Sequence, residues 1–214
     1  MRRRRTDAFT LIEVCLAIAI LALLMALAYG VLNTNLAAAD RIEKVLRRVE
    51  IGPAVMHAVE QDLRCVLRLQ DNAKPTFVGK QGTDGADYDQ VDFVSTRDGF
   101  DSERQKVCDF CETGFRMERN SDGPDQGFYT LYRRFDPFID SEPLKGGVLI
   151  PVYTRVKRFN LRYSDGNEWK EEWDNKQANG YPKSVEVTLE LDYGDGEEGN
   201  TELTKFTTVI PLQQ

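Results

Sequence analysis

The amino-acid sequence predicts an α+β protein, with one long N-terminal helix followed by a β-rich domain. The first observation is an unbroken apolar run that continues into apolar side chains at helical spacing, together covering residues 14–67. The second is a series of short segments between residues 128 and 211 in which apolar and polar side chains alternate. A length of 214 residues leaves room for an N-terminal segment and one domain of ordinary size.

The charge of the chain is unevenly distributed along the sequence. The net charge is −7, yet four arginines stand within the first five residues, and without residues 1–8 the net charge would be −10. An acidic body argues against a nucleic-acid partner, because such a surface needs clustered Lys and Arg to neutralise phosphates. The sequence also lacks a P-loop, a dinucleotide-binding glycine pattern and a His–Glu zinc helix. We therefore expect no nucleic-acid partner and no cofactor.

The apolar run from Val14 to Leu32 has the length of a membrane span. Its 19 residues would form a helix about 28 Å long, close to the hydrocarbon thickness of a bilayer. Because the arginines precede the run, the positive-inside rule places the N-terminus in the cytoplasm and the chain beyond about Asn33 across the membrane.

The span has two simple interpretations. A secretory signal peptide would be cut at the small-x-small site Ala26–Ala28, which would release a secreted binding domain. A plain anchor would stay uncut. Neither interpretation requires Glu13, a carboxylate at the edge of the apolar run.

The segment "AFTLIEV", residues 8–14, resembles the class III signal of type IV pilins and type II secretion pseudopilins. The resemblance implies that a prepilin peptidase removes the leader, residues 1–8, between Ala8 and Phe9 and methylates the new N-terminus at Phe9. Glu13 is then the fifth mature residue, where this family carries Glu. The family usually has Gly before the cut, and this chain has Ala8, which is also small.

Glu13 is interpreted as an assembly residue. Cleavage would create an α-ammonium on Phe9, and the amine of a neighbouring subunit could pair with Glu13 inside the apolar bundle. Such pairing relieves the penalty on a lone carboxylate in a medium of low dielectric constant. The alternative is that Glu13 only reaches toward the lipid headgroups.

Residues 33–67 predict an amphipathic helical stalk that continues the transmembrane helix, residues 9–32. A helix from Phe9 to about Leu67 would be about 88 Å long. Gly52 and Pro53 predict a kink or break, since proline removes a backbone donor and clashes with the preceding turn. The apolar positions of the stalk are Ile42, Leu46, Val49, Val55, Val59, Leu63 and Val66.

Residues 68–214 predict the β-rich globular domain. Val185, Val187, Leu189 and Leu191 alternate with polar residues, as in a half-buried antiparallel strand. The strands are predicted at residues 76–79, 128–135, 147–156, 158–166, 184–194 and 201–211.

The block from residue 156 to 194 resembles the C-terminal part of the minor pseudopilin J family of type II secretion. It contains an Asp-Gly turn, the pair Trp169 and Trp173, then Pro182 and the strand "VEVTLEL". The segment "EQDLR", residues 60–64, adds to the resemblance. It implies a pilin-like lollipop, in which a long helix packs on an antiparallel β-rich domain.

The resemblance also implies a function without enzymatic chemistry. The chain would be a minor pseudopilin of the type II secretion system, anchored in the inner membrane with a periplasmic domain. Its partners would be other minor pseudopilins of the pseudopilus tip, the major pseudopilin, the prepilin peptidase and membrane lipid. The alternatives are a minor pilin of a type IV pilus or competence system and a membrane-anchored thiol redox protein.

Cys108 and Cys111 form the C-x-x-C pair of this chain. In an oxidising periplasm they would close a structural disulfide or remain thiols. The redox alternative needs a helix that begins at the pair after a strand. A zinc site would need two more ligands, and neither Cys65 nor His57 has suitable spacing.

Two acidic clusters raise the possibility of calcium, although no EF-hand pattern is present and solvated loops are the expected interpretation. Trp169 and Trp173 are expected to pack over the sheet, with a carbohydrate or peptide platform as the alternative. His57 is expected to be a surface or packing residue. The clusters are Asp84, Asp87 and Asp89, and Asp192, Asp195, Glu197 and Glu198.

Overall fold

The computed structural model divides the chain into two compact units, Met1–Leu46 and Arg47–Gln214. The structure describes residues 10–69, 74–82, 88–97, 99–101, 106–121, 123, 125–137, 139, 144–178, 180–194 and 202–212.

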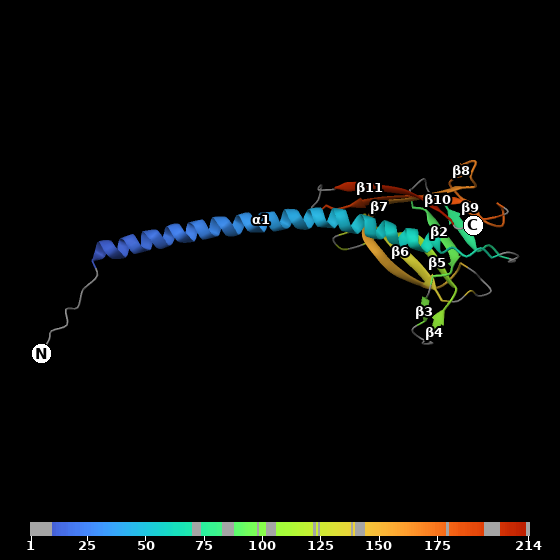
Figure 1. The fold of residues 1–214 in the computed structure, drawn as a ribbon, viewed down its shortest axis with the longest axis horizontal. Coiled ribbons are helices and arrows are strands. Elements are labelled where there is room, and N and C mark those ends of the chain that lie inside the picture. The colour runs from blue at the N-terminus through green and yellow to red at the C-terminus, as the bar shows by residue number, and fades with distance from the viewer. Residues whose placement is uncertain are drawn as a thin grey trace. The chain divides into compact units, whose positions relative to one another are not determined.

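Helix α1, Leu11–Arg64, begins in the first unit and ends in the second (Figure 1). Its 54 residues include the segment Leu11–Glu43, which is long and apolar enough to cross a membrane and has no buried side chains. The part of α1 from Ile51 onward packs on the sheet of the second unit.

Of the kink or break predicted at Gly52 and Pro53, the break is wrong, because α1 continues through both residues to Arg64. Pro53 is exposed, whereas Ile51 before it and Val55 after it pack against the core. Gly52 is buried, and a Cβ there would lie 2.6 Å from the Tyr193 hydroxyl and still closer to the Phe206 ring. Gly52 therefore serves as a notch that admits two aromatic side chains, and it does not interrupt the helix.

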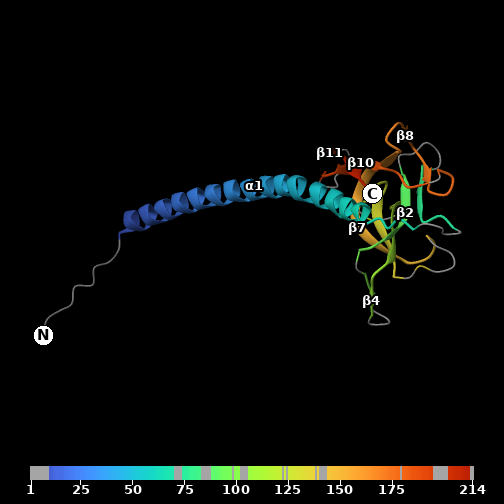
Figure 2. The ribbon, with the colours of Figure 1, turned by 45° about the vertical axis from the view of Figure 1, so that its right-hand side comes forward.

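Nine strands form one antiparallel sheet in the order β11-β10-β7-β6-β5-β2-β1-β9, with β8 paired to β7. A separate hairpin of β3 and β4 projects from this sheet (Figures 1 and 2). The strands are β1 Phe77–Lys80, β2 Gln90–Ser95, β3 Gly99–Asp101, β4 Lys106–Cys108, β5 Cys111–Arg119, β6 Tyr129–Asp136, β7 Val148–Ser164, β8 Trp169–Lys170, β9 Trp173–Asp174, β10 Ser184–Asp192 and β11 Leu203–Pro211.

The strands predicted at residues 76–79, 128–135, 184–194 and 201–211 are confirmed as β1, β6, β10 and β11. The two segments predicted at residues 147–156 and 158–166 form a single strand, β7, which has 17 residues. β6 pairs with its first half and β10 with its second half, so one long strand serves two neighbours.

The hydrophobic core lies between one face of this sheet and the C-terminal part of α1. Val55, Val59 and Leu63 of α1 are buried there. The aromatic side chains of the core come from five strands: Phe77, Phe93, Phe115, Phe159, Tyr163 and Trp173. The predicted class, a long N-terminal helix with an antiparallel β-rich domain, is confirmed.

Candidate assembly site

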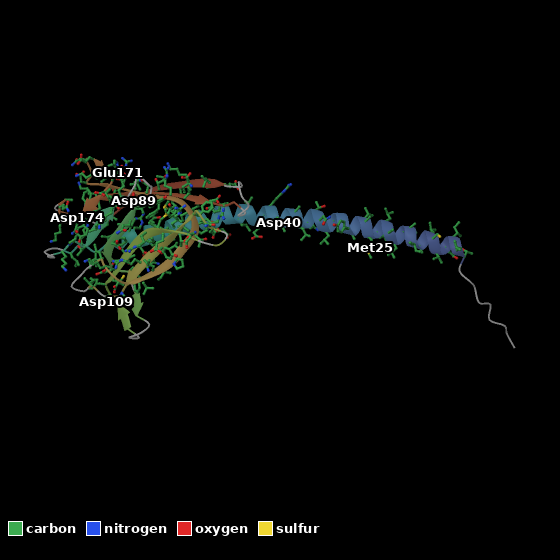
Figure 3. All side chains as sticks on the ribbon, turned by 180° about the vertical axis from the view of Figure 1, so that it is seen from behind. Met25, Asp40, Asp89, Asp109, Glu171 and Asp174 are labelled. Atoms are coloured by element: carbon green, nitrogen blue, oxygen red, sulfur yellow. The ribbon has the colours of Figure 1, made fainter. Side chains whose placement is uncertain are left out.

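The N-terminal part of α1 presents apolar side chains on all of its faces. Leu11, Leu23 and Met25 are 82%, 61% and 65% exposed, and every described side chain from Thr10 to Glu43 is exposed (Figure 3). Leaving this much apolar surface in water would cost about 25 cal/mol for each Å². This segment therefore requires lipid or the helices of other chains around it.

Glu13 closes a capping box at the start of α1. Its Oε2 accepts hydrogen bonds from the Thr10 backbone N–H and from Thr10 Oγ1, both at 3.2 Å. In return, the Glu13 N–H lies 3.4 Å from Thr10 Oγ1. Thr-x-x-Glu is the sequence signature of this motif, and it satisfies N–H groups that a helix N-terminus leaves unpaired. The signal is present in the sequence at residues 10–13, where the prediction for Glu13 had not included it.

The capping box leaves Glu13 with acceptor positions free for a positively charged group. Both bonds from Thr10 end on Oε2, whereas an ionised carboxylate offers about four acceptor positions. Ala8 and Phe9, the predicted processing residues, lie outside the described residues. Pairing of Glu13 with an amine therefore stays a prediction.

Asp62 fixes the C-terminal part of α1 to the sheet. Its fully buried carboxylate accepts a hydrogen bond from Arg133 Nε at 2.5 Å and forms an ion pair with Arg97. A buried carboxylate is tolerated when such partners compensate its lost hydration. On the exposed side of the helix, Glu60 pairs with Arg64 at 2.7 Å. The segment "EQDLR" thus contains one buried and one exposed ion pair.

Two carboxylates from the acidic clusters are structural. Asp89 is buried and accepts hydrogen bonds from the N–H groups of Leu161, at 2.6 Å, and Gly82, at 3.2 Å. β6 pairs with β7 only as far as Val156. At Leu161, the Asp89 carboxylate therefore takes the place of an acceptor from a neighbouring strand. The expectation of a solvated loop is wrong for Asp89, because the Leu161 N–H inside the sheet needs an acceptor.

Asp192 is also fully buried, at the end of β10. Burial alone would raise the pKa of its carboxyl, but hydrogen bonds from the N–H groups of Gly194 and Glu202 and the ion pair with Arg155 hold the pKa below its usual range. The solvated-loop expectation is therefore wrong for Asp192 as well. Arg155 also binds Asp125 at 3.0 Å and so joins a loop to β7 and β10.

The described residues contain no group of three or more His, Cys, Asp or Glu arranged to hold a metal ion. The remaining cluster members lie outside the part of the chain that the structure describes, so calcium binding stays untested. They are Asp84, Asp87, Asp195, Glu197 and Glu198.

The C-x-x-C pair lies between two strands. β4 ends at Cys108 and β5 begins at Cys111. The redox alternative requires a helix that begins at the pair, and a strand begins there instead. The Cys108 side chain is outside the described side chains, and the disulfide with Cys111 stays a prediction.

The two tryptophans differ in burial. Trp173 is 5% exposed in the core and donates its Nε1–H to the Gly180 carbonyl at 3.0 Å, as expected for packing. Trp169 is 39% exposed, and the Arg162 guanidinium lies 5.6 Å from its ring. His57 is exposed on α1, and its Nε2 lies 2.7 Å from the Gln61 amide nitrogen, which agrees with a surface role.

An exposed apolar helix of membrane length, continued by a segment that packs on an antiparallel sheet, defines a pilin-like subunit. The family model described as "Type II secretion system (T2SS), protein J" matches residues 30–197. A second model, "Prokaryotic N-terminal methylation motif", matches residues 3–29. The chain belongs to the type II secretion system protein J family and is a minor pseudopilin.

Individual relatives agree with the family models. The chain is 29% identical over 201 residues to type II secretion system protein J of Vibrio cholerae serotype O1, covering 90% of this chain and 86% of the relative. It is 29% identical over 203 residues to protein J of Klebsiella pneumoniae, covering 90% and 92%. Among solved structures, a type IV-like pilin from Thermus thermophilus matches the fold with a TM-score of 0.51 at 11% identity, over 78% of this chain and 95% of the pilin.

These findings confirm the membership of the type II secretion protein J family that the N-terminal signal and the Trp169–Leu191 block indicated. They favour type II secretion over the alternative of a type IV or competence pilin. The apolar N-terminal helix and the methylation motif together make the chain a membrane-anchored protein.

Proposed function

We propose that this minor pseudopilin joins other minor pseudopilins in the tip complex that starts the pseudopilus. Through the tip it supports the export of folded proteins across the outer membrane. The observation that carries the proposal is the first part of α1, whose side chains are exposed throughout Leu11–Glu43 while Glu13 stands at its start. Its partners are the helices of the other minor pseudopilins, the major pseudopilin and membrane lipid.

The membrane orientation follows from the arginine-rich start. Residues 2–5 remain in the cytoplasm, and the β-rich domain lies in the periplasm. The prepilin peptidase cuts between Ala8 and Phe9 and methylates Phe9. The match of the methylation motif to residues 3–29 supports this processing.

Glu13 has two successive roles in this proposal. In the free subunit its carboxylate caps α1 through Thr10. In the assembled bundle it also pairs with the α-ammonium of a neighbouring subunit. A capping interaction is worth about 0.5–2 kcal/mol, whereas an ion pair broken inside a low-dielectric bundle costs about 3–5 kcal/mol. The ion pair is therefore the larger contribution.

The substitution Glu13→Gln separates the two roles, because Gln can complete a capping box but carries no charge. We expect export of a secreted enzyme to fall to a small fraction of the wild-type level in Glu13→Gln. The matched variant Thr10→Ala, which removes the capping hydroxyl and keeps the charge, should retain most of the export. N-terminal sequencing should find a methylated Phe9 in wild type and in both variants.

The proposal fails if Glu13→Gln exports at the wild-type level, or if the mature chain begins at Met1 or Tyr29. The chain acts in this proposal by assembly and carries out no reaction of its own. Accordingly, replacing Cys108 and Cys111 with Ser should leave export unchanged, and a loss of export with a normally folded protein would favour the redox alternative.

A further inference from the structure

Strand β11 forms one edge of the nine-stranded sheet, and its outer side pairs with no strand among the residues that the structure describes (Figure 1). It has nine residues and pairs with β10 along its whole length without a shift in register. The strand at the opposite edge, β9, has two residues. A long, regular edge strand presents a row of unpaired backbone groups to any extended chain. β11 is therefore the edge at which this sheet can accept another strand.

The hydrogen bonds at the two ends of β11 show which of its backbone groups face outward. Before the strand, the Tyr193 N–H donates to the Glu202 carbonyl at 2.9 Å. After it, the Leu212 N–H donates to the Lys183 carbonyl, also at 2.9 Å. Hydrogen-bonded pairs alternate with non-bonded pairs along an antiparallel ladder, so the even-numbered residues of β11 bond to β10. The odd-numbered residues direct their backbone groups toward the free edge, where only the final proline has no N–H. They are Leu203, Lys205, Thr207, Val209 and Pro211.

The side chains of these odd-numbered residues are all exposed. They share the outer face of the sheet, because side chains two residues apart on a strand point to the same side. The C-terminal part of α1 packs on the other face, where Phe206 meets Gly52. Leu203 and Val209, near the two ends of β11, are 45% and 49% exposed. An added strand would gain hydrogen bonds along the edge and apolar contacts near both of its ends.

A row of alternating charges crosses the outer face and ends at Lys205. Arg158 of β7 is paired with Glu190 of β10, and Arg158 Nε lies 3.7 Å from Glu190 Oε2. Glu190 is in turn paired with Lys205 of β11. The charges across the three strands are thus positive, negative and positive. A carboxylate on a further strand, opposite Lys205, would continue this order, and opposite charges on paired residues stabilise a sheet.

A second copy of β11 fits this edge poorly. β11 contains no Asp or Glu, so a copy paired with it would place a threonine, a lysine or an apolar side chain opposite Lys205. A lysine on an edge strand is one of the features by which proteins discourage pairing between identical edges. The charge of the edge therefore favours a different chain that carries a carboxylate.

We propose that the free edge of β11 binds an extended segment of another protein by strand addition, with a carboxylate opposite Lys205 and apolar side chains opposite Leu203 and Val209. The segment is extended because only a strand offers N–H and C=O groups at the spacing of the edge. Thr207, whose Oγ1 lies 3.2 Å from Thr188 Oγ1, favours a hydroxyl side chain at the position between them. An antiparallel segment would therefore carry apolar, hydroxyl, acidic and apolar side chains at alternate positions.

This binding goes beyond the proposed function, since it uses neither Glu13 nor the apolar part of α1. The test is fluorescence anisotropy with the purified full-length chain in detergent and a labelled synthetic peptide. The peptide carries Val, Thr, Glu and Leu at alternate positions, with Thr between them. It should bind at concentrations up to about 1 mM. A peptide methylated on the backbone nitrogens of the central Thr and the Glu, which face β11, should bind about tenfold more weakly or not at all.

Thr207→Pro tests the edge itself, because it removes an outward N–H while the bonds between β10 and β11 remain. It should lower the affinity for the peptide about tenfold or more. The matched variant Thr207→Ala loses the same hydroxyl but keeps the N–H, and it should bind within about twofold of wild type. Thermal melting of both variants shows whether the domain stays folded.

Lys205→Glu tests the charge. This variant should bind the original peptide more weakly than wild type does, and it should prefer a peptide with Lys in place of Glu. Because the preference is reversed and not only lost, damage to the fold cannot explain it.

Three results would overturn the proposal. The first is a wild-type chain that binds the peptide no better than its methylated form. The second is equal affinity in folded Thr207→Pro and Thr207→Ala, or an unchanged preference in Lys205→Glu. The third is self-association of the chain that Thr207→Pro abolishes in size-exclusion chromatography, which would make a second copy the occupant. The peptide assay contains no other subunit, so its failure leaves the proposed function standing, and the export assay of Glu13→Gln tests that function separately.

Discussion

The two parts of α1 differ in what surrounds them. Every described side chain from Thr10 to Glu50 is exposed, whereas Val55, Val59 and Leu63 are buried against the sheet. The backbone is one continuous helix through both parts. Helical structure alone therefore does not tell where the folded domain begins. The second part is stabilised within the chain, and the first part depends on lipid and on other subunits.

The largest expected contrast between the two parts is in the free energy of unfolding of the β-rich domain. Leu63→Ala removes a fully buried side chain and should lower this free energy by about 2–5 kcal/mol. Leu24→Ala, at a position 57% exposed in the apolar segment, should leave it unchanged. Urea unfolding of the detergent-solubilised chain measures both. Equal losses would mean that the apolar segment belongs to the folded domain.

A smaller contrast is expected between the two ion pairs of "EQDLR". Asp62→Asn leaves Arg97 and Arg133 without their shared carboxylate and should cost about 2–3 kcal/mol of stability. Glu60→Gln, which breaks an exposed pair on the same helix, should cost about 0.5 kcal/mol or less. Urea midpoints under the same conditions test this order. A cost for Glu60→Gln as large as that for Asp62→Asn would contradict the role given to Asp62.

The two glycines of α1 offer a third contrast. Gly52→Ala places a Cβ against Tyr193 and Phe206 and should cost about 1–3 kcal/mol by overpacking. Gly30→Ala meets no atom within 4 Å and should leave the stability of the domain unchanged. Differential scanning calorimetry of the two variants measures the stability of the domain in each. A stable Gly52→Ala protein would show that the notch is not required.

The smallest expected effect is on how the free energy of unfolding depends on pH in the acidic range. The folded-state pKa of Asp192 is lower than its unfolded value of 3.8, so its contribution to stability is present above that value and is lost as the pH falls through the folded pKa. Asp192→Asn should therefore make stability fall less steeply over this acid range. Urea unfolding at a series of acidic pH values measures the slope. An unchanged slope would show that Asp192 gains nothing from Arg155 and its two backbone donors.

The sequence predicted the elements in which the spacing of apolar side chains shows which residues face the core or the membrane. β10 was predicted because its core-facing residues alternate with polar ones, and the apolar span was predicted from its length and apolar composition. β2 was missed, since Val91–Ser95 is buried throughout and has no alternation to detect. Asp92 in its centre is held by Arg134 at 2.7 Å, a contact between strands that no local pattern reveals.

For the candidate site, the sequence predicted some residues but missed their interactions. Glu13 was found through the family signal, but its capping bond to Thr10 was overlooked although Thr-x-x-Glu is visible in the sequence. Gly52 was read as a helix breaker because its aromatic neighbours, Tyr193 and Phe206, are distant in sequence. The acids Asp89 and Asp192 were interpreted as loop carboxylates for the same reason, because Leu161, a donor to Asp89, and Arg155, a donor to Asp192, are distant in sequence.

The central claim is that the charge of Glu13 acts between subunits. Its most direct test is to purify the full-length chain from detergent-solubilised membranes and to quantify the other pseudopilins that accompany it, in wild type and in Glu13→Gln. Copurification is expected to fall about tenfold or more in Glu13→Gln, because an ion pair is lost in a low-dielectric bundle, while the amount of chain in the membrane fraction is unchanged. Equal copurification in the two proteins would contradict the account.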